Sequence, residues 1–65
     1  MRSHPLTRAE IAAELLRDCP PEALPDHRYV ADAITSGHPI VHILQMPELD
    51  AWPETYLWLK SNLVD

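Results

Sequence analysis

The stretch LTRAEIAAELLRD, residues 6–18, decides the fold class of this 65-residue chain. Thr7 and Glu10 have the spacing of a capping box, in which each side chain accepts a hydrogen bond from the other residue's backbone N–H at the start of a helix. Apolar residues then recur every three or four positions as far as Cys19, which is the period of one helix face. The stretch therefore predicts an amphipathic helix over residues 8–18.

Seven prolines divide the rest of the chain into segments of helix length, because proline interrupts a helix anywhere except in its first turn. A second helix is expected between Asp26, a good N-cap residue, and Gly37, a good residue to follow a helix end. Its predicted apolar face consists of Tyr29, Val30, Ala33 and Ile34.

Residues 39–46 fit a short helix and a buried strand nearly equally well, since they are short and rich in β-branched residues. A lone strand would have no partner among helical neighbours, so a short helix is favoured. A last helix begins between Asp50 and Pro53, and its predicted apolar face consists of Tyr56, Leu57, Leu59, Leu63 and Val64.

The expected fold is therefore all-α, a small irregular bundle of about three to four short helices joined by proline-rich links. Residues 1–65 are expected to form a single domain, in which residues 1–5 are mobile.

Charge and cysteine content narrow the classes of function. Ten Asp and Glu against five Lys and Arg give a net charge of -5, which disfavours direct binding to nucleic acid or to an anionic membrane. Cys19 is the one cysteine, so an internal disulfide is excluded. With neither an apolar run of bilayer length nor a recognisable signal peptide, a soluble cytoplasmic protein is expected.

The residues that usually support catalysis are scarce. A single glycine leaves no phosphate-binding loop, and no serine lies in the G-x-S-x-G pattern of a nucleophile elbow. Cys19 follows a predicted helix C-terminus, where the helix dipole and the neighbouring Asp18 both disfavour a thiolate. We therefore expect neither an enzyme nor a bound cofactor.

Three of the four aromatic residues, Trp52, Tyr56 and Trp58, lie close together near the C-terminus. At 100° per residue, Trp58 falls on the polar side of the last helix. A large aromatic side chain on a polar face is typical of a protein interface. The alternative is that an irregular fold covers Trp58 with loops, and the sequence alone leaves both interpretations open.

Glu10, Glu14 and Asp18 form an acidic stripe at i,i+4 spacing on the first helix, with Arg17 placed to pair with Glu14. Such a stripe is typical of a solvated face. It would also suit electrostatic steering of a basic partner, or a mimic of nucleic-acid phosphates.

His38 and His42 have the i,i+4 spacing at which two imidazoles on one helix can share a metal ion. Cys19 and His27 would complete a set of four ligands that zinc accepts. The spacing matches no standard zinc finger, so ordinary surface and turn histidines are the main interpretation.

These observations favour a non-catalytic protein-binding module, acting as a small regulator, inhibitor or accessory subunit of a larger protein or complex. A chain of this size has a small core and commonly depends on a partner for stability. The predicted contact residues are Trp58, Trp52, Tyr56, Glu10, Glu14 and Asp18. The alternatives are a small metal-binding protein that uses His38 and His42, an acidic nucleic-acid mimic, and self-association through the same aromatic face.

Overall fold

The computed structural model describes residues 6–17 and 19–63. Within these residues every regular element is helical and no strand occurs, so the predicted all-α class is confirmed. The predictions for residues 1–5, Asp18 and Val64 lie outside the described residues.

Helix α1 spans Arg8–Arg17 and begins with the predicted capping box. The Thr7 backbone N–H donates to Glu10 Oε1 at 2.8 Å, and the Glu10 backbone N–H donates to Thr7 Oγ1 at 3.2 Å. Two of the backbone donors that a helix start leaves without intrahelical partners are thereby satisfied by side chains.

Helix α2 spans Leu24–Thr35 and follows directly on a 3-10 turn, η1, at Pro21–Ala23. The prediction that Asp26 caps this helix is wrong, because the helix begins before it. Pro25 lies in the first turn, where its missing N–H costs nothing and its fixed φ suits a helix, so it opens α2 instead of separating it from η1.

Helix α2 ends before Gly37, as the sequence predicts, and its end forms a Schellman motif. Gly37 has a φ of +84°, a conformation that glycine adopts without strain. Its N–H donates to the Ile34 carbonyl at 3.2 Å, and the His38 N–H donates to the Ala33 carbonyl at 3.2 Å.

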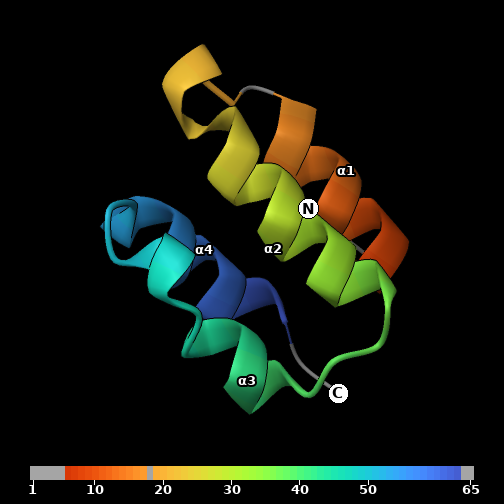
Figure 1. Cartoon of the computed structure of the whole chain (residues 1–65). Coiled ribbons are helices and arrows are strands. Elements are labelled where there is room, and N and C mark those ends of the chain that lie inside the picture. The colour runs from red at the N-terminus through yellow and green to blue at the C-terminus, as the bar shows by residue number, and fades with distance from the viewer. Residues whose placement is uncertain (1–5, 18, 64–65) are drawn as a thin grey trace.

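Helices α1 and α2 form an antiparallel pair (Figure 1). The start of α1 is tied to the end of α2 by Arg8, whose Nη1 donates to the carbonyl oxygens of Ile34 at 3.1 Å and His38 at 2.8 Å. A cation placed there also suits the negative end of the α2 dipole.

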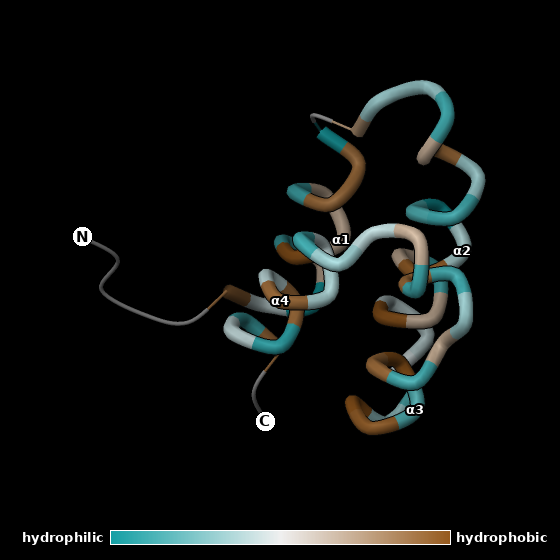
Figure 2. The backbone as a smooth tube through the Cα atoms, turned by 90° about the vertical axis from the view of Figure 1, so that its left-hand side faces the viewer, coloured by the Kyte–Doolittle hydropathy of each residue, from teal (hydrophilic) through white to brown (hydrophobic). Residues whose placement is uncertain are grey.

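The second layer consists of α3 (Ile40–Leu44), a 3-10 turn η2 (Pro47–Leu49) and α4 (Pro53–Asn62). The choice of helix over strand for residues 39–46 is confirmed, and α4 begins inside the predicted window. In Figure 1 these elements lie together on one side of the α1–α2 pair. Figure 2 shows hydrophilic and hydrophobic residues alternating along the helices, as amphipathic helices require.

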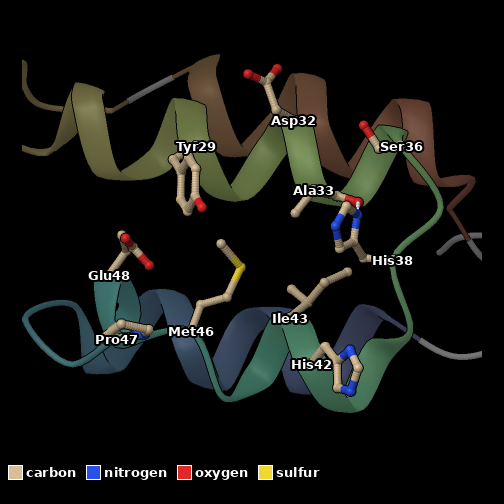
Figure 3. A pocket seen from close by; sticks show the side chains of 10 residues that line it. All are labelled: Tyr29, Asp32, Ala33, Ser36, His38, His42, Ile43, Met46, Pro47 and Glu48. Atoms are coloured by element: carbon tan, nitrogen blue, oxygen red, sulfur yellow. Dashed lines mark hydrogen bonds between the residues drawn. The ribbon is translucent and has the colours of Figure 1, made fainter.

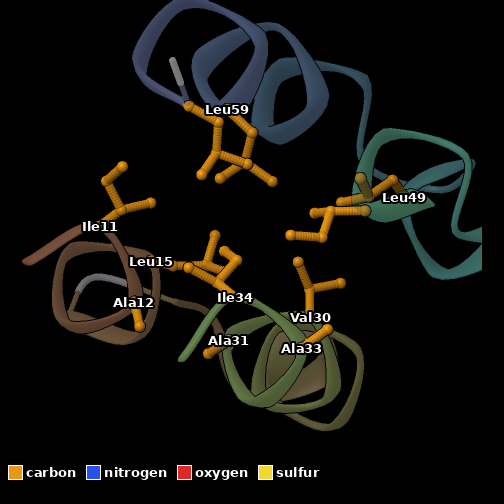
Figure 4. Packing of buried hydrophobic residues seen from close by; sticks show 11 residues of the cluster. Ile11, Ala12, Leu15, Val30, Ala31, Ala33, Ile34, Leu49 and Leu59 are labelled. Carbon is orange, nitrogen blue, oxygen red and sulfur yellow. The ribbon is translucent and has the colours of Figure 1, made fainter. Parts of the chain in front are cut away.

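The core lies between the two layers and draws on α1, α2, α3, η2 and α4 (Figure 4). Its fully buried side chains are Ile11, Val30, Ile34, Ile43 and Leu59.

Two residues predicted for the apolar faces are instead exposed, Tyr29 and Leu57, each at 59%. The predicted apolar faces included residues that nothing covers. The second layer packs on only one side of α2, and α4 directs Leu57 away from the core.

Candidate functional site

A cleft of about 390 Å³ lies between α2 and the α3–η2 segment. The α2 wall consists of Tyr29, Asp32, Ala33 and Ser36. The facing side consists of His38, His42, Ile43, Met46, Pro47 and Glu48. Figure 3 shows Tyr29 and Ala33 pointing from α2 toward the facing side, whereas Asp32 and Ser36 point away from it.

The α2 wall follows from helix periodicity. Tyr29, Asp32, Ala33 and Ser36 are spaced i, i+3, i+4 and i+7, so they form one stripe along the flank of α2. Ala33 leaves room at the centre of this stripe, while Tyr29 stands exposed at one end. In Figure 3 the Tyr29 side chain points across the cleft toward the η2 side.

Glu48 lies on the facing wall, in the middle of η2. Pro47 opens this turn, and Leu49, which is 3% exposed, anchors it in the core. Glu48 Oε1 is buried and has no hydrogen-bond partner among the described residues. Burial of an unpaired carboxylate oxygen is costly, so a donor would stabilise this carboxylate once the Glu48 side chain turns this oxygen toward the cleft.

The floor of the cleft is apolar. Met46 extends between Tyr29 and Ile43, and Ala33 faces them from α2 (Figure 3). The site thus combines an apolar floor with a carboxylate and a phenol at one end and His38 at the other.

His38 has its tautomer set by the fold. Its Nδ1 lies 3.2 Å from the Ala33 carbonyl oxygen. A carbonyl oxygen can only accept a hydrogen bond, so Nδ1 carries the hydrogen in this contact.

The predicted set of metal ligands is not brought together. His38 follows the end of α2 and His42 lies within α3, so they do not share one helix, although both line the same cleft. Cys19 and His27 line a separate depression. Among residues 6–17 and 19–63, no three His, Cys, Asp or Glu side chains are grouped so that they could hold a metal ion.

The separate depression measures about 340 Å³ and includes two of the predicted contact residues, Trp58 and Glu14. Trp58 is partly buried and packs against the core cluster, which agrees with the interpretation that the fold covers it. Glu14 Oε2 lies 3.6 Å from Arg17 Nη1, the pair that the sequence predicts.

The other predicted aromatic contacts have structural partners of their own. Trp52 Nε1–H donates to Asp26 Oδ2 at 3.0 Å, and its ring meets His27 edge-on at a centroid distance of 5.7 Å. Tyr56 is partly buried against the core. The three aromatics therefore face different neighbours and form no single exposed surface.

The residues of the predicted acidic stripe are engaged in separate interactions where the structure describes them. The Glu10 carboxylate is engaged in the capping box, Glu14 pairs with Arg17, and Asp18 lies outside the described residues.

His27 is a buried polar residue that the sequence does not reveal as such, at 5% exposed. Its Nε2 lies 3.2 Å from Thr55 Oγ1, whereas its Nδ1 is buried with no partner among the described residues. The contact between these two side chains joins α2 to α4.

Cys19 carries a thiol whose pKa is raised above its usual value by burial and, secondarily, by the Glu22 carboxylate. The Sγ–H donates to the Pro20 carbonyl oxygen at 3.4 Å. The sequence correctly predicts a disfavoured thiolate, but it names different causes, the helix dipole and Asp18.

Sequence reasoning missed Tyr29 and Glu48 as candidate site residues. The stripe of Tyr29, Asp32 and Ser36 was a readable signal, because these residues recur at helical spacing beside the buried face. Glu48 gave no local signal, since its position opposite Tyr29 is set by tertiary packing.

None of the helices in the described part of the chain is long and apolar enough to cross a membrane. Comparison with protein-family models, with curated proteins and with solved structures finds no match to the chain in any of the three.

Proposed function

We propose that this protein is a non-catalytic, cytoplasmic protein-binding module that regulates, inhibits or assists a larger protein, and that the α2–α3 cleft is its contact surface. The observation that carries the proposal is the apolar floor of the cleft with Tyr29 at its mouth, 59% exposed. An exposed tyrosine beside a concave apolar surface is typical of the residues that dominate binding energy in protein interfaces, and methionine is enriched in such interfaces.

The partly buried aromatic residues predicted from sequence, Trp52, Tyr56 and Trp58, remain the second candidate contact, although they form no single exposed surface. This candidate is supported by the exposed Leu57 on α4, next to the partly buried Trp58. Its weakness is that Trp52, Tyr56 and Trp58 all contribute to folding, so substituting them changes stability as well as any interface.

The proposal is tested by affinity capture from lysate of the source organism, identification of the bound protein, and titration of that purified partner. Tyr29→Ala is the informative variant and Leu57→Ala its matched control, because both side chains are 59% exposed and lie on different helices. Trp58→Ala tests the second candidate surface, with its folded fraction measured in parallel.

We expect Tyr29→Ala to weaken partner binding about tenfold, the loss typical of an interface residue that costs over 1 kcal/mol, while Leu57→Ala binds as wild type does. If Leu57→Ala and Trp58→Ala lose binding while Tyr29→Ala binds normally, the contact surface lies on α4 and not at the cleft. A folded protein that binds no partner in any condition would refute the module, and metal content and light scattering would then test the metal-binding and self-association alternatives.

A further inference from the structure

We propose that the α2–α3 cleft receives a basic side chain of the partner protein, best an arginine, with Glu48 as its anionic contact. This inference rests on the proposed function, since it names the chemistry by which a protein partner would be recognised.

The charge of the site favours a cation. Glu48 Oε1 is buried and lacks a hydrogen-bond donor within the described residues. Asp32 adds a second carboxylate to the lining, although in Figure 3 it points away from the facing side, and the lining, all of it described, contains neither Lys nor Arg. An incoming guanidinium or ammonium group would give Glu48 a charge-assisted hydrogen bond, which is stronger than one between neutral groups. The net charge of -5 would steer a basic partner to the molecule.

The shape of the site favours a cation on an aliphatic stem over a bare ion. Ala33, Ile43 and Met46 line the floor, and the methylene groups of Arg and Lys pack along such apolar surface while the charged head stays at a polar group. Methionine also adapts its shape to an incoming side chain.

Tyr29 accounts for the preference for arginine. Its side chain points toward the η2 wall that carries Glu48 (Figure 3). A planar guanidinium can lie against an aromatic ring and donate two hydrogen bonds to one carboxylate, whereas an ammonium group offers a point charge without the flat surface.

The fold fixes the backbone at Glu48 before binding. Pro47 begins η2, the Leu49 N–H donates to the Met46 carbonyl at 3.0 Å, and the Leu49 side chain is buried in the core. Binding would therefore order the Glu48 side chain without also having to order its backbone.

The test uses small probes, so that it does not depend on the identity of the partner. Nα-acetyl-arginine amide is titrated into the full chain while the NMR signals of Tyr29, Ile43 and Met46 are followed. Nα-acetyl-citrulline amide, which has nearly the same shape and no charge, is the control ligand. Glu48→Gln is the informative variant and Glu22→Gln the control, because each removes one carboxylate and Glu22 is exposed on η1, outside the cleft lining.

We expect the arginine probe to shift the cleft signals with a millimolar Kd and the citrulline probe to bind at least tenfold more weakly. Glu48→Gln should weaken arginine binding about tenfold, while Glu22→Gln changes it less than twofold. Equal binding of the two probes, or equal losses in the two variants, would overturn the inference. Nα-acetyl-lysine amide binding as tightly as the arginine probe would overturn the preference for arginine.

The two proposals fail separately. If a partner binds through Tyr29 but the cleft binds the arginine and citrulline probes equally, the basic-side-chain inference is wrong. The proposed protein-binding module is then still supported. Discrimination at the cleft without any protein partner refutes the module and leaves the cation site.

Discussion

Replacing Trp58 with alanine is expected to destabilise the fold by about 2 kcal/mol, although the sequence places this residue on a polar face. Truncating a fully buried Trp typically costs about 3–5 kcal/mol. Trp58 is partly buried against the core cluster, so roughly half of that loss is expected. For a domain of this size each kcal/mol lowers Tm by about 4–8 °C, which gives a fall of about 8–16 °C.

The assay is thermal unfolding followed by circular dichroism, with Leu57→Ala as the matched control. Leu57 is the neighbour of Trp58 on the same helix and is 59% exposed, so its truncation should change stability by less than about 0.5 kcal/mol. A Trp58→Ala protein that melts within about 3 °C of the Leu57→Ala protein would refute the reasoning, since it would show that the core contacts of Trp58 contribute almost nothing.

The remaining predictions concern the helix ends and the thiol. Thr7→Ala should lower the unfolding free energy by about 1 kcal/mol and Glu10→Gln by less, because an amide oxygen still accepts; denaturant melts showing equal losses would contradict the reciprocal cap. Gly37→Ala should cost about 1 kcal/mol through backbone strain alone, because φ is +84° and a Cβ there meets nothing within 4 Å; an unchanged melt would contradict this. Because burial and Glu22 raise the pKa of Cys19, iodoacetamide should label the native thiol more slowly than the unfolded one at pH 8, and Glu22→Gln should speed the native reaction. A native rate equal to the unfolded rate would count against both causes.

The helix ends were the most predictable part of the fold, because their signals are local. The capping box at Thr7 and Glu10 and the helix end at Gly37 each depend on residues a few positions apart, and the structure confirms both. The start of α2 was mispredicted because two local signals competed. Asp26 is a good N-cap, but Pro25 in the first turn allows the helix to begin earlier.

The faces of the helices were less predictable, since exposure depends on what packs against each helix. Periodicity places Tyr29 beside Val30 and Ile34, yet only the last two are covered. Likewise, Leu57 and Trp58 are neighbours, and the fold covers the one that periodicity assigns to the polar side. The interface residues predicted from those faces are untested. The cleft could not be predicted from a local sequence pattern, because it brings together Tyr29 and Glu48 from separate elements.

The position of α2 links the stability of this small domain to its proposed binding. Arg8 ties the end of α2 to α1, and the Asp26–Trp52 hydrogen bond ties its start to α4. The cleft lies between this braced helix and the α3–η2 segment, so a ligand there bridges both layers of the fold.

A ligand that binds the native state alone stabilises it by about 2.7 kcal/mol at a concentration one hundred times its Kd. A chain of this length has only about 3–5 kcal/mol of stability from its core. Occupation of the cleft would therefore supply a large share of the total stability. The partner would thus take the place that a disulfide or a structural metal holds in other domains of this size.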